Sequence, residues 1–146
     1  MKKKPISAAA SGYSGTPLAK KLGIKPGGRV CFIRAPADYK ALLAPLPEGV
    51  RFTRAIDANS DVIHLFCTRR RELEEGLRLA MAKMRPDAAI WASWPKKSAG
   101  VETDIVEGTI REVALPMGLV DVKVCAVDAT WSGLKLVVRV ENRERR

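Results

Sequence analysis

Three runs in this chain of 146 residues are apolar at nearly every inner position and are only six or seven residues long. They occupy residues 29–34, 61–67 and 88–93. Strands with both faces buried read as continuous apolar runs, whereas strands with one wet face alternate. The three runs therefore predict central strands of a largely parallel sheet with helices packed on both of its faces.

The segments between these runs complete an alternation of strands and helices. Helices are expected at 18–22, 39–44, 69–85 and 101–115, and further strands at 50–53, 120–127 and 134–140. Thr16 and Pro17 are typical of a helix start, with Thr16 as N-cap, and Ile105, Val106, Ile110 and Val113 form the apolar stripe of the last helix. The order predicts an α/β three-layer sandwich whose mostly parallel sheet ends in an antiparallel hairpin.

One connection strains this prediction. The link 54–60 has only seven residues, whereas a parallel crossover usually needs a dozen or more. An extended chain of that length can reach roughly 23 Å, so a crossover without a helix remains open beside an irregular edge strand.

The chain divides into one domain and two basic tails. Residues 1–12 lack periodicity and are expected to be a disordered tail, residues 13–142 form the domain, and residues 143–146 form a C-terminal tail. The tails carry half of the net charge of +10. No apolar run is long enough for a bilayer span or a signal peptide, which predicts a cytoplasmic protein without a membrane partner.

Two levels of resemblance follow from specific strings. The runs 22–30, 61–66 and 118–120 resemble the class I S-adenosylmethionine (SAM) methyltransferase fold, a Rossmann-like fold, with one helix and one strand removed. The longer strings 12–23, 93–97, 122–128 and 131–135 resemble the bacterial family catalogued as domain of unknown function 3052. The resemblance implies the fold and brings no activity with it.

The carboxyl ends of the expected strands are rich in cations. Ligands bind at this edge of open α/β sheets, and a helix N-terminus attracts anions there. The candidate ligand-binding residues are Arg34, Thr68 as the helix N-cap, Arg69, Arg70, Arg71, Trp94, Lys96 and Lys97. The accessory candidates are Tyr13, Ser14, Thr16, Asp128, Trp131 and Ser132.

The usual cofactor signature is missing from the same edge. SAM and dinucleotide sites need glycines in the turn after the first strand and an acidic residue at the end of the second. Here the turn 34–38 has no glycine, and the end of the second strand carries Thr53 and Arg54 instead of an acidic residue. No cofactor is therefore predicted, and a divergent SAM-dependent methyltransferase is kept as an alternative.

Other chemistry finds little support. His64 lies in the middle of an apolar run and is expected to be a core histidine, and the three cysteines are expected to be reduced core residues. No ligand spacing for a metal occurs. The acidic residues at 72, 74, 75, 102 and 104 are interpreted as solvated surface.

The sequence thus favours a ligand-binding domain without catalysis. Its expected partner is an anionic small molecule or an acidic protein surface at the strand carboxyl ends. The alternatives are the divergent methyltransferase and a regulatory or nucleic-acid-binding module driven by the basic tails. The ligand and the oligomeric state stay open.

Overall fold

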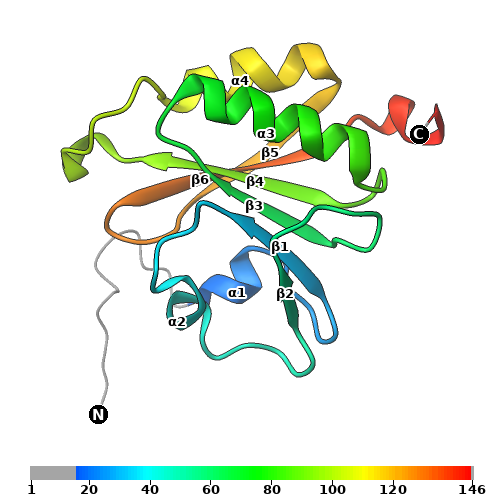
Figure 1. The fold of residues 1–146 in the computed structure, drawn as a ribbon, viewed down its shortest axis with the longest axis horizontal. Helices are drawn as coiled ribbons and strands as arrows, with labels where there is room; N and C mark the ends of the chain where they lie inside the picture. Colours follow the sequence, from blue (N-terminus) through cyan, green and yellow to red (C-terminus); the bar gives the residue numbers. More distant parts are fainter. Residues whose placement is uncertain (1–15, 146) are drawn as a thin grey trace.

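The computed structural model describes residues 16–145, and these residues build a three-layer α/β sandwich around one six-stranded sheet (Figure 1). The strand order is β2-β1-β3-β4-β6-β5. The strands are β1 (Arg29–Ile33), β2 (Arg51–Thr53), β3 (Val62–Phe66), β4 (Ala89–Pro95), β5 (Leu119–Ala126) and β6 (Trp131–Val138). The first four are mutually parallel, and β6 runs antiparallel between β4 and β5. The predicted fold class is confirmed.

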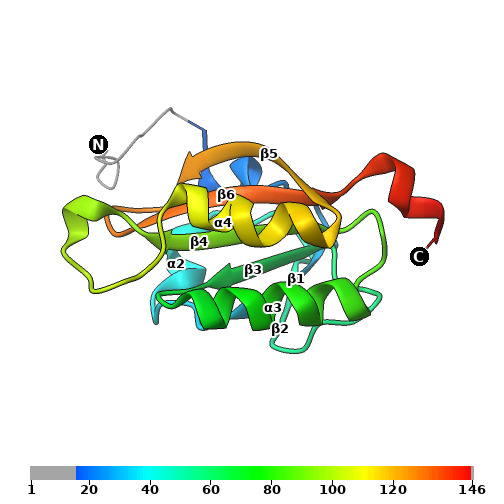
Figure 2. The same ribbon diagram turned by 90° about the horizontal axis from the view of Figure 1, so that it is seen from above.

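The two faces of the sheet are covered unequally. One face holds the longer helices α3 (Arg70–Lys83) and α4 (Glu107–Ala114), which run side by side along the strands (Figure 2). The other holds α1 (Leu18–Lys21) and α2 (Tyr39–Leu43). The single-turn helices η2 (Lys97–Ala99) and η3 (Leu115–Met117) lie at the two ends of the segment that contains α4, and η4 (Val140–Arg145) follows β6.

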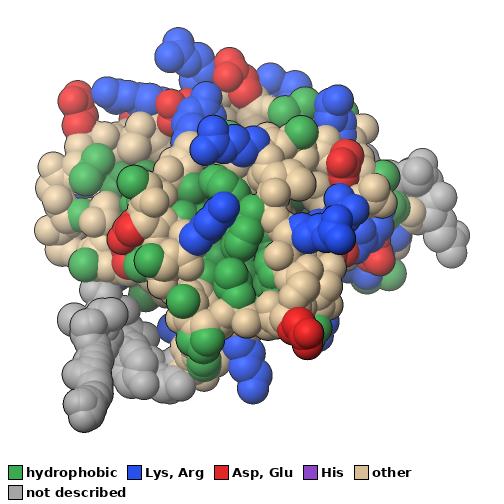
Figure 3. Space-filling view, turned by 60° about the horizontal axis from the view of Figure 1, so that its bottom comes forward, with side chains coloured by type: hydrophobic (Ala, Val, Ile, Leu, Met, Phe, Trp, Pro, Cys, Tyr) green, Lys and Arg blue, Asp and Glu red, His purple; other side chains and the backbone are tan. Residues whose placement is uncertain are grey.

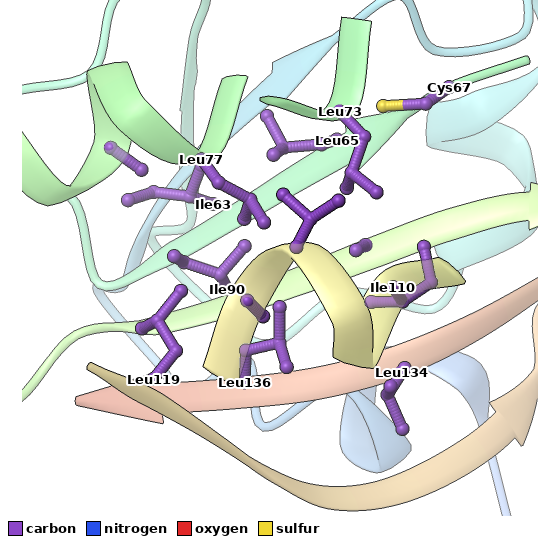
Figure 4. Close-up of a cluster of buried hydrophobic side chains, with 14 of the residues drawn as sticks. Ile63, Leu65, Cys67, Leu73, Leu77, Ile90, Ile110, Leu119, Leu134 and Leu136 are labelled. Atoms are coloured by element: carbon purple, nitrogen blue, oxygen red, sulfur yellow. The ribbon is translucent and has the colours of Figure 1, made fainter. Parts of the chain in front are cut away.

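Each face has its own apolar core. The larger core packs α3 and α4 onto the sheet, with Leu77 of α3 and Ile110 of α4 fully buried against Ile90 and Leu136 (Figure 4). The smaller core lies under α1 and α2 and contains Tyr39, Phe66 and Trp91. Its rim includes the half-buried rings of Phe32 and Phe52, so this face is covered less completely.

The link 54–60 makes the parallel crossover. Both β2 and β3 pair in parallel with β1, on its two opposite edges, so the link passes β1 without a helix. Ser60 stabilises the end of the link, because its hydroxyl accepts the Asp57 N–H at 3.2 Å.

The prediction of a helix over 101–115 is wrong in its first third. The helix begins only at Glu107, and Val106, expected in the apolar stripe, is 59% exposed. Thr109 accepts the Val106 N–H through its hydroxyl at 3.1 Å, which caps the helix at that point. Residues 101–106 instead lie in irregular backbone, and Thr103 bonds to Thr68 O at 2.7 Å.

The first helix also begins differently from the prediction. Its N-cap is Pro17, and no side chain caps it, so Thr16 does not have the expected role. The expected tail 1–12 lies outside the described residues. At the other end, Arg143 donates from Nε to the Val138 carbonyl oxygen at 3.0 Å.

Candidate functional site

The carboxyl ends of β1, β3 and β4 come together at one edge, as the parallel order requires. Arg34 follows β1 and lies 3.4 Å from Glu72 of α3. Lys96 follows β4 and donates its backbone N–H to Thr130 O, in the β5–β6 turn, at 2.7 Å. Arg34 therefore lies beside the start of α3, and Lys96 lies beside the β5–β6 turn.

The N-terminus of α3 is capped by carboxylates of the chain itself. Glu72 accepts the N–H groups of Thr68 and Arg69 at 3.0 and 3.3 Å, and Asp104 accepts the Arg70 N–H at 2.6 Å. Arg69, not Thr68, occupies the N-cap position, which corrects the predicted role of Thr68. Glu72 and Asp104 are therefore structural carboxylates rather than solvated surface, and these N–H groups are already bonded.

Carboxylates also surround two of the three arginines. Arg69 lies 3.6 Å from Glu102, and Arg70 pairs with Glu74 at 3.1 Å and with Glu112 at 2.8 Å. Glu74 is four residues along the same helix, whereas Glu102 and Glu112 come from distant parts of the chain, so the sequence order did not reveal that those two converge here. The positive field expected at this end of α3 is largely compensated.

The aromatic and lysine candidates divide by exposure. Trp94 lies inside β4 and is 7% exposed, so its ring packs in the core and offers no open stacking face. Lys97 is exposed, Lys96 is half-buried, and Arg71 is exposed.

The accessory candidates shape the β5–β6 turn. Asp128 accepts the N–H groups of Thr130 and Trp131 through Oδ1, each at 2.8 Å. The Trp131 ring packs edge-on against Phe66 with centroids 5.0 Å apart, and Ser132 pairs with Trp94 in the sheet. Tyr13 and Ser14 lie outside the described residues.

An open cavity of about 290 Å³ lies at the carboxyl end of β1 beside β2. Its lining consists of Phe32, Ile33, Arg34, Ala35 and Arg54. The Arg54 guanidinium lies over the Phe32 ring, 5.8 Å from its centroid. The sequence placed Arg54 at the end of the second strand, but only the fold brings it to Phe32 and Arg34.

Arg34 has an unusual backbone conformation. Its φ is +60°, and no other non-glycine residue among those described has a positive φ. An L-residue in this left-handed region is strained, whereas glycine adopts it freely. Such strain is concentrated at ligand sites and switches.

The single histidine is fully buried, as predicted. His64 contacts the Tyr39 hydroxyl through Nδ1 at 2.9 Å and the Ser93 hydroxyl through Nε2 at 2.7 Å. Burial lowers its pKa to about 3, so the ring is neutral at physiological pH. Because no part of His64 or Ser93 is exposed, the three side chains form a buried structural chain.

The cysteines are free thiols. Cys31 and Cys67 are buried, and Cys125 is half-buried. Burial raises the pKa of Cys67 to about 12, which keeps it protonated.

Within residues 16–145, no three His, Cys, Asp or Glu side chains are grouped closely enough to hold a metal ion. Among the same residues, no helix is long and apolar enough to cross a bilayer.

A second cavity, of about 410 Å³, opens at the amino ends of the strands. Lys25, Arg29, Arg85 and Lys135 supply its cations. Asp61 accepts the Arg29 N–H at 2.8 Å and pairs with Arg85, which also bonds Asp87 at 2.7 Å. No pattern in the sequence indicated this cavity, because its lining comes from four separate segments.

Solved structures of methyltransferases share this fold. A SAM-dependent methyltransferase from Aquifex aeolicus aligns with a TM-score of 0.53 and 14% identity over 83% of this chain and 88% of that one. OxaC in complex with SAH and oxaline aligns at 0.57 and 12%, covering 85% of this chain and 46% of OxaC. LepI in complex with SAM aligns at 0.50 and 14%, covering 84% of this chain.

These likenesses establish the methyltransferase-like Rossmann fold at low identity. The chain spans only 39% of LepI, whereas it spans most of the Aquifex protein. No protein-family model matches the chain, and no curated protein matches its sequence. The resemblance to the domain 3052 family is therefore not confirmed.

Proposed function

We propose that this domain binds a small anionic ligand of nucleotide size in the cavity between Arg34 and Arg54. The observation that supports this most is the strained, exposed Arg34 facing the same cavity as Arg54, at the strand ends where this fold binds ligands. Two guanidinium groups match a phosphate or carboxylate, and the Phe32 ring offers an apolar wall. Catalysis is not part of the proposal.

The binding position differs from the one predicted from the sequence. Arg34 stays in the site, whereas the α3 N-terminus has its own carboxylates. Arg54 has no carboxylate partner within 4.0 Å among the described residues, and Arg34 has only the longer contact to Glu72. A ligand anion could therefore approach Arg54 without first displacing a carboxylate.

SAM-dependent methyl transfer is the second candidate, because the structural neighbours include SAM-dependent methyltransferases. The residues at the cofactor position do not fit SAM well. SAM has a net positive charge, and both flanking side chains are arginines. Arg34 stands in the turn that requires glycine in such sites, and the carboxylate of Asp57 is used in its own turn, where it accepts the Asn59 N–H at 2.8 Å.

Calorimetric titration with AMP, ADP, inorganic phosphate, SAM and SAH tests both candidates. We expect AMP or ADP to bind the wild type, and Arg34→Ala/Arg54→Ala to weaken that binding at least tenfold. Arg78→Ala/Lys83→Ala removes two exposed cations from α3 and is the matched control, expected to bind like the wild type.

Three outcomes would reject the proposal. The first is the absence of heat with every anionic compound at millimolar concentration. The second is equal binding of AMP or ADP by the Arg34/Arg54 variant and the wild type. The third, which would favour the second candidate, is binding of SAM or SAH that survives the Arg34/Arg54 double substitution.

A further inference from the structure

The ion pairs of the described chain are unevenly distributed. All of them use arginines, and they lie around α3 and α4 or at the amino ends of the strands. No lysine of residues 16–145 has a described carboxylate within 4.0 Å. The face with α1 and α2 shows Lys and Arg side chains over and around an apolar hollow (Figure 3).

Two lysines on this side of the sheet stand directly opposite each other. Lys123 of β5 pairs with Lys135 of β6 in the antiparallel register. Lys135 also pairs with Trp91 of β4, whose ring bonds Leu22 O behind α1 at 3.0 Å. Opposed residues of antiparallel strands share a face, so both lysines lie on the α1 side.

One more lysine adjoins this pair. Lys25 of the α1–β1 connection and Lys135 of β6 line the same cavity of about 410 Å³. Because Lys135 also stands opposite Lys123, the three side chains Lys25, Lys123 and Lys135 form one surface, called the lysine face below.

This arrangement is unfavourable for the isolated protein. Like charges directly opposite in a sheet destabilise it, and no carboxylate within ion-pair distance compensates them. Local conflicts of this kind are concentrated at functional sites, where a partner resolves them. The partner must therefore supply several negative charges spaced along a surface.

We propose that the lysine face binds the phosphate backbone of a nucleic acid without reading its sequence. Backbone phosphates present regularly spaced charges that flexible lysines can follow. Protein interfaces are depleted in lysine, which disfavours an acidic protein. Membrane surfaces select aromatic anchors, whereas the exposed large hydrophobic side chains of the described chain are valines and a leucine.

This surface is separate from the proposed ligand cavity. It lies on β5, β6 and the α1–β1 connection, whereas the cavity lies at the carboxyl ends of β1 and β2. The backbone contact is therefore independent of Arg34 and Arg54.

Fluorescence anisotropy of a labelled duplex of about 20 base pairs, titrated at several KCl concentrations, tests the proposal. We expect the logarithm of affinity to fall linearly with the logarithm of salt. Lys123→Gln/Lys135→Gln should reduce that slope by about 2, because two phosphate contacts are lost. Lys83→Gln/Lys97→Gln removes the same charge elsewhere and should leave the slope unchanged.

Two further measurements check that the lysine variant is folded and that the two proposed sites are separate. Lys123→Gln/Lys135→Gln should unfold at an equal or higher temperature than the wild type, because a repulsion is removed. Arg34→Ala/Arg54→Ala should keep its duplex affinity, which separates this surface from the ligand cavity.

Several results would overturn the proposal. They are no duplex binding by the wild type at low salt, equal slopes for the two lysine pairs, and complete loss of binding on deletion of residues 1–12. Tighter binding to phosphatidylserine vesicles than to the duplex would also overturn it.

Discussion

At the scale of single residues, Arg34 has both a strained backbone and a place in the lining of the proposed ligand cavity. It is the first residue after β1, its φ is +60°, and its side chain lines the cavity beside Arg54. Glycine would relieve the strain and remove the guanidinium, while alanine would remove the guanidinium and keep the strain. The two substitutions therefore separate the conformational role of this residue from its charge.

We predict that Arg34→Gly is more stable than Arg34→Ala by about 1 kcal/mol, and that neither variant binds AMP like the wild type. Urea unfolding measures the first part and calorimetric titration the second. At Arg78, inside α3, the order should reverse, because glycine in a helix costs about 1 kcal/mol relative to alanine. If Arg34→Gly were the less stable variant, strain at this position would be disproved.

His64 predicts how stability depends on pH. Its pKa is lowered from 6.5 to about 3 in the folded protein, so the unfolded chain binds the extra proton first as pH falls. Folding stability is therefore lost below about pH 6.5, at up to about 1.4 kcal/mol per pH unit. Urea unfolding at about pH 7 and pH 5 measures this loss, before most carboxylates titrate.

The comparison with His64→Gln isolates the imidazole. The chain has one histidine, so the variant should show little slope over this range even if its absolute stability is lower. Equal slopes in the two proteins would mean that His64 is not the group responsible.

At the scale of secondary-structure elements, the start of α3 shows how a sequence signal was misinterpreted. Arg69, Arg70 and Arg71 stand at the start of the helix, which led to the expectation of an anion site. Glu72 and Asp104 instead bond the N–H groups of Thr68, Arg69 and Arg70. Carboxylates are favourable at this end of a helix because of its dipole, so the chain supplies its own anions.

We predict that Glu72→Ala destabilises the protein by about 1 kcal/mol, because the N–H groups of Thr68 and of the N-cap residue Arg69 lose their acceptor. Glu75 lies about one turn further along the same helix, and its side chain is exposed. Glu75→Ala should therefore lower the stability much less than Glu72→Ala. Urea unfolding compares the variants. Added phosphate should stabilise Glu72→Ala more than the wild type, because the freed helix end can then accept an anion; an equal effect on both would argue against this cap.

At the scale of the whole molecule, the two layers of helices differ in strength. Helix α3 has 14 residues and packs on the larger core, whereas α1 and α2 have 4 and 5 residues. Helices this short gain little from their own hydrogen bonds and depend on packing. Strand β2, at the sheet edge with 3 residues, belongs to the same weaker side.

Hydrogen exchange followed by mass spectrometry should reveal this difference. Amides of β3, β4 and β6 should exchange slowest, through global unfolding, and amides of α1, α2 and β2 should exchange at a lower free energy of opening. Uniform protection across the sheet and both layers would contradict the difference. Slower exchange in α2 and β2 on addition of AMP would support the proposed cavity.

Local pattern predicted the elements well where burial alone decides them. The apolar runs became β1, β3 and β4, and the helical stripe of 69–85 became α3. The prediction was poorer where a side-chain hydrogen bond sets the end of an element. The Thr109 hydroxyl accepts the Val106 N–H, so α4 begins later than the apolar pattern indicated. The strand ends Arg34, Trp94 and Lys97 were placed at the correct edge, but the burial of Trp94 was not foreseen.

The sequence by itself determined the architecture, because the period and length of apolar runs depend on which faces are buried. It also predicted the core position of His64 and the absence of the glycine signature after β1. Tertiary structure alone decided which charges neutralise one another. Asp104 reaches the Arg70 N–H at the start of α3 from 34 residues away along the chain. Arg54 lines the same cavity as Arg34, and Lys123 faces Lys135. Electrostatic partners are set by distance in space, which a linear pattern does not record.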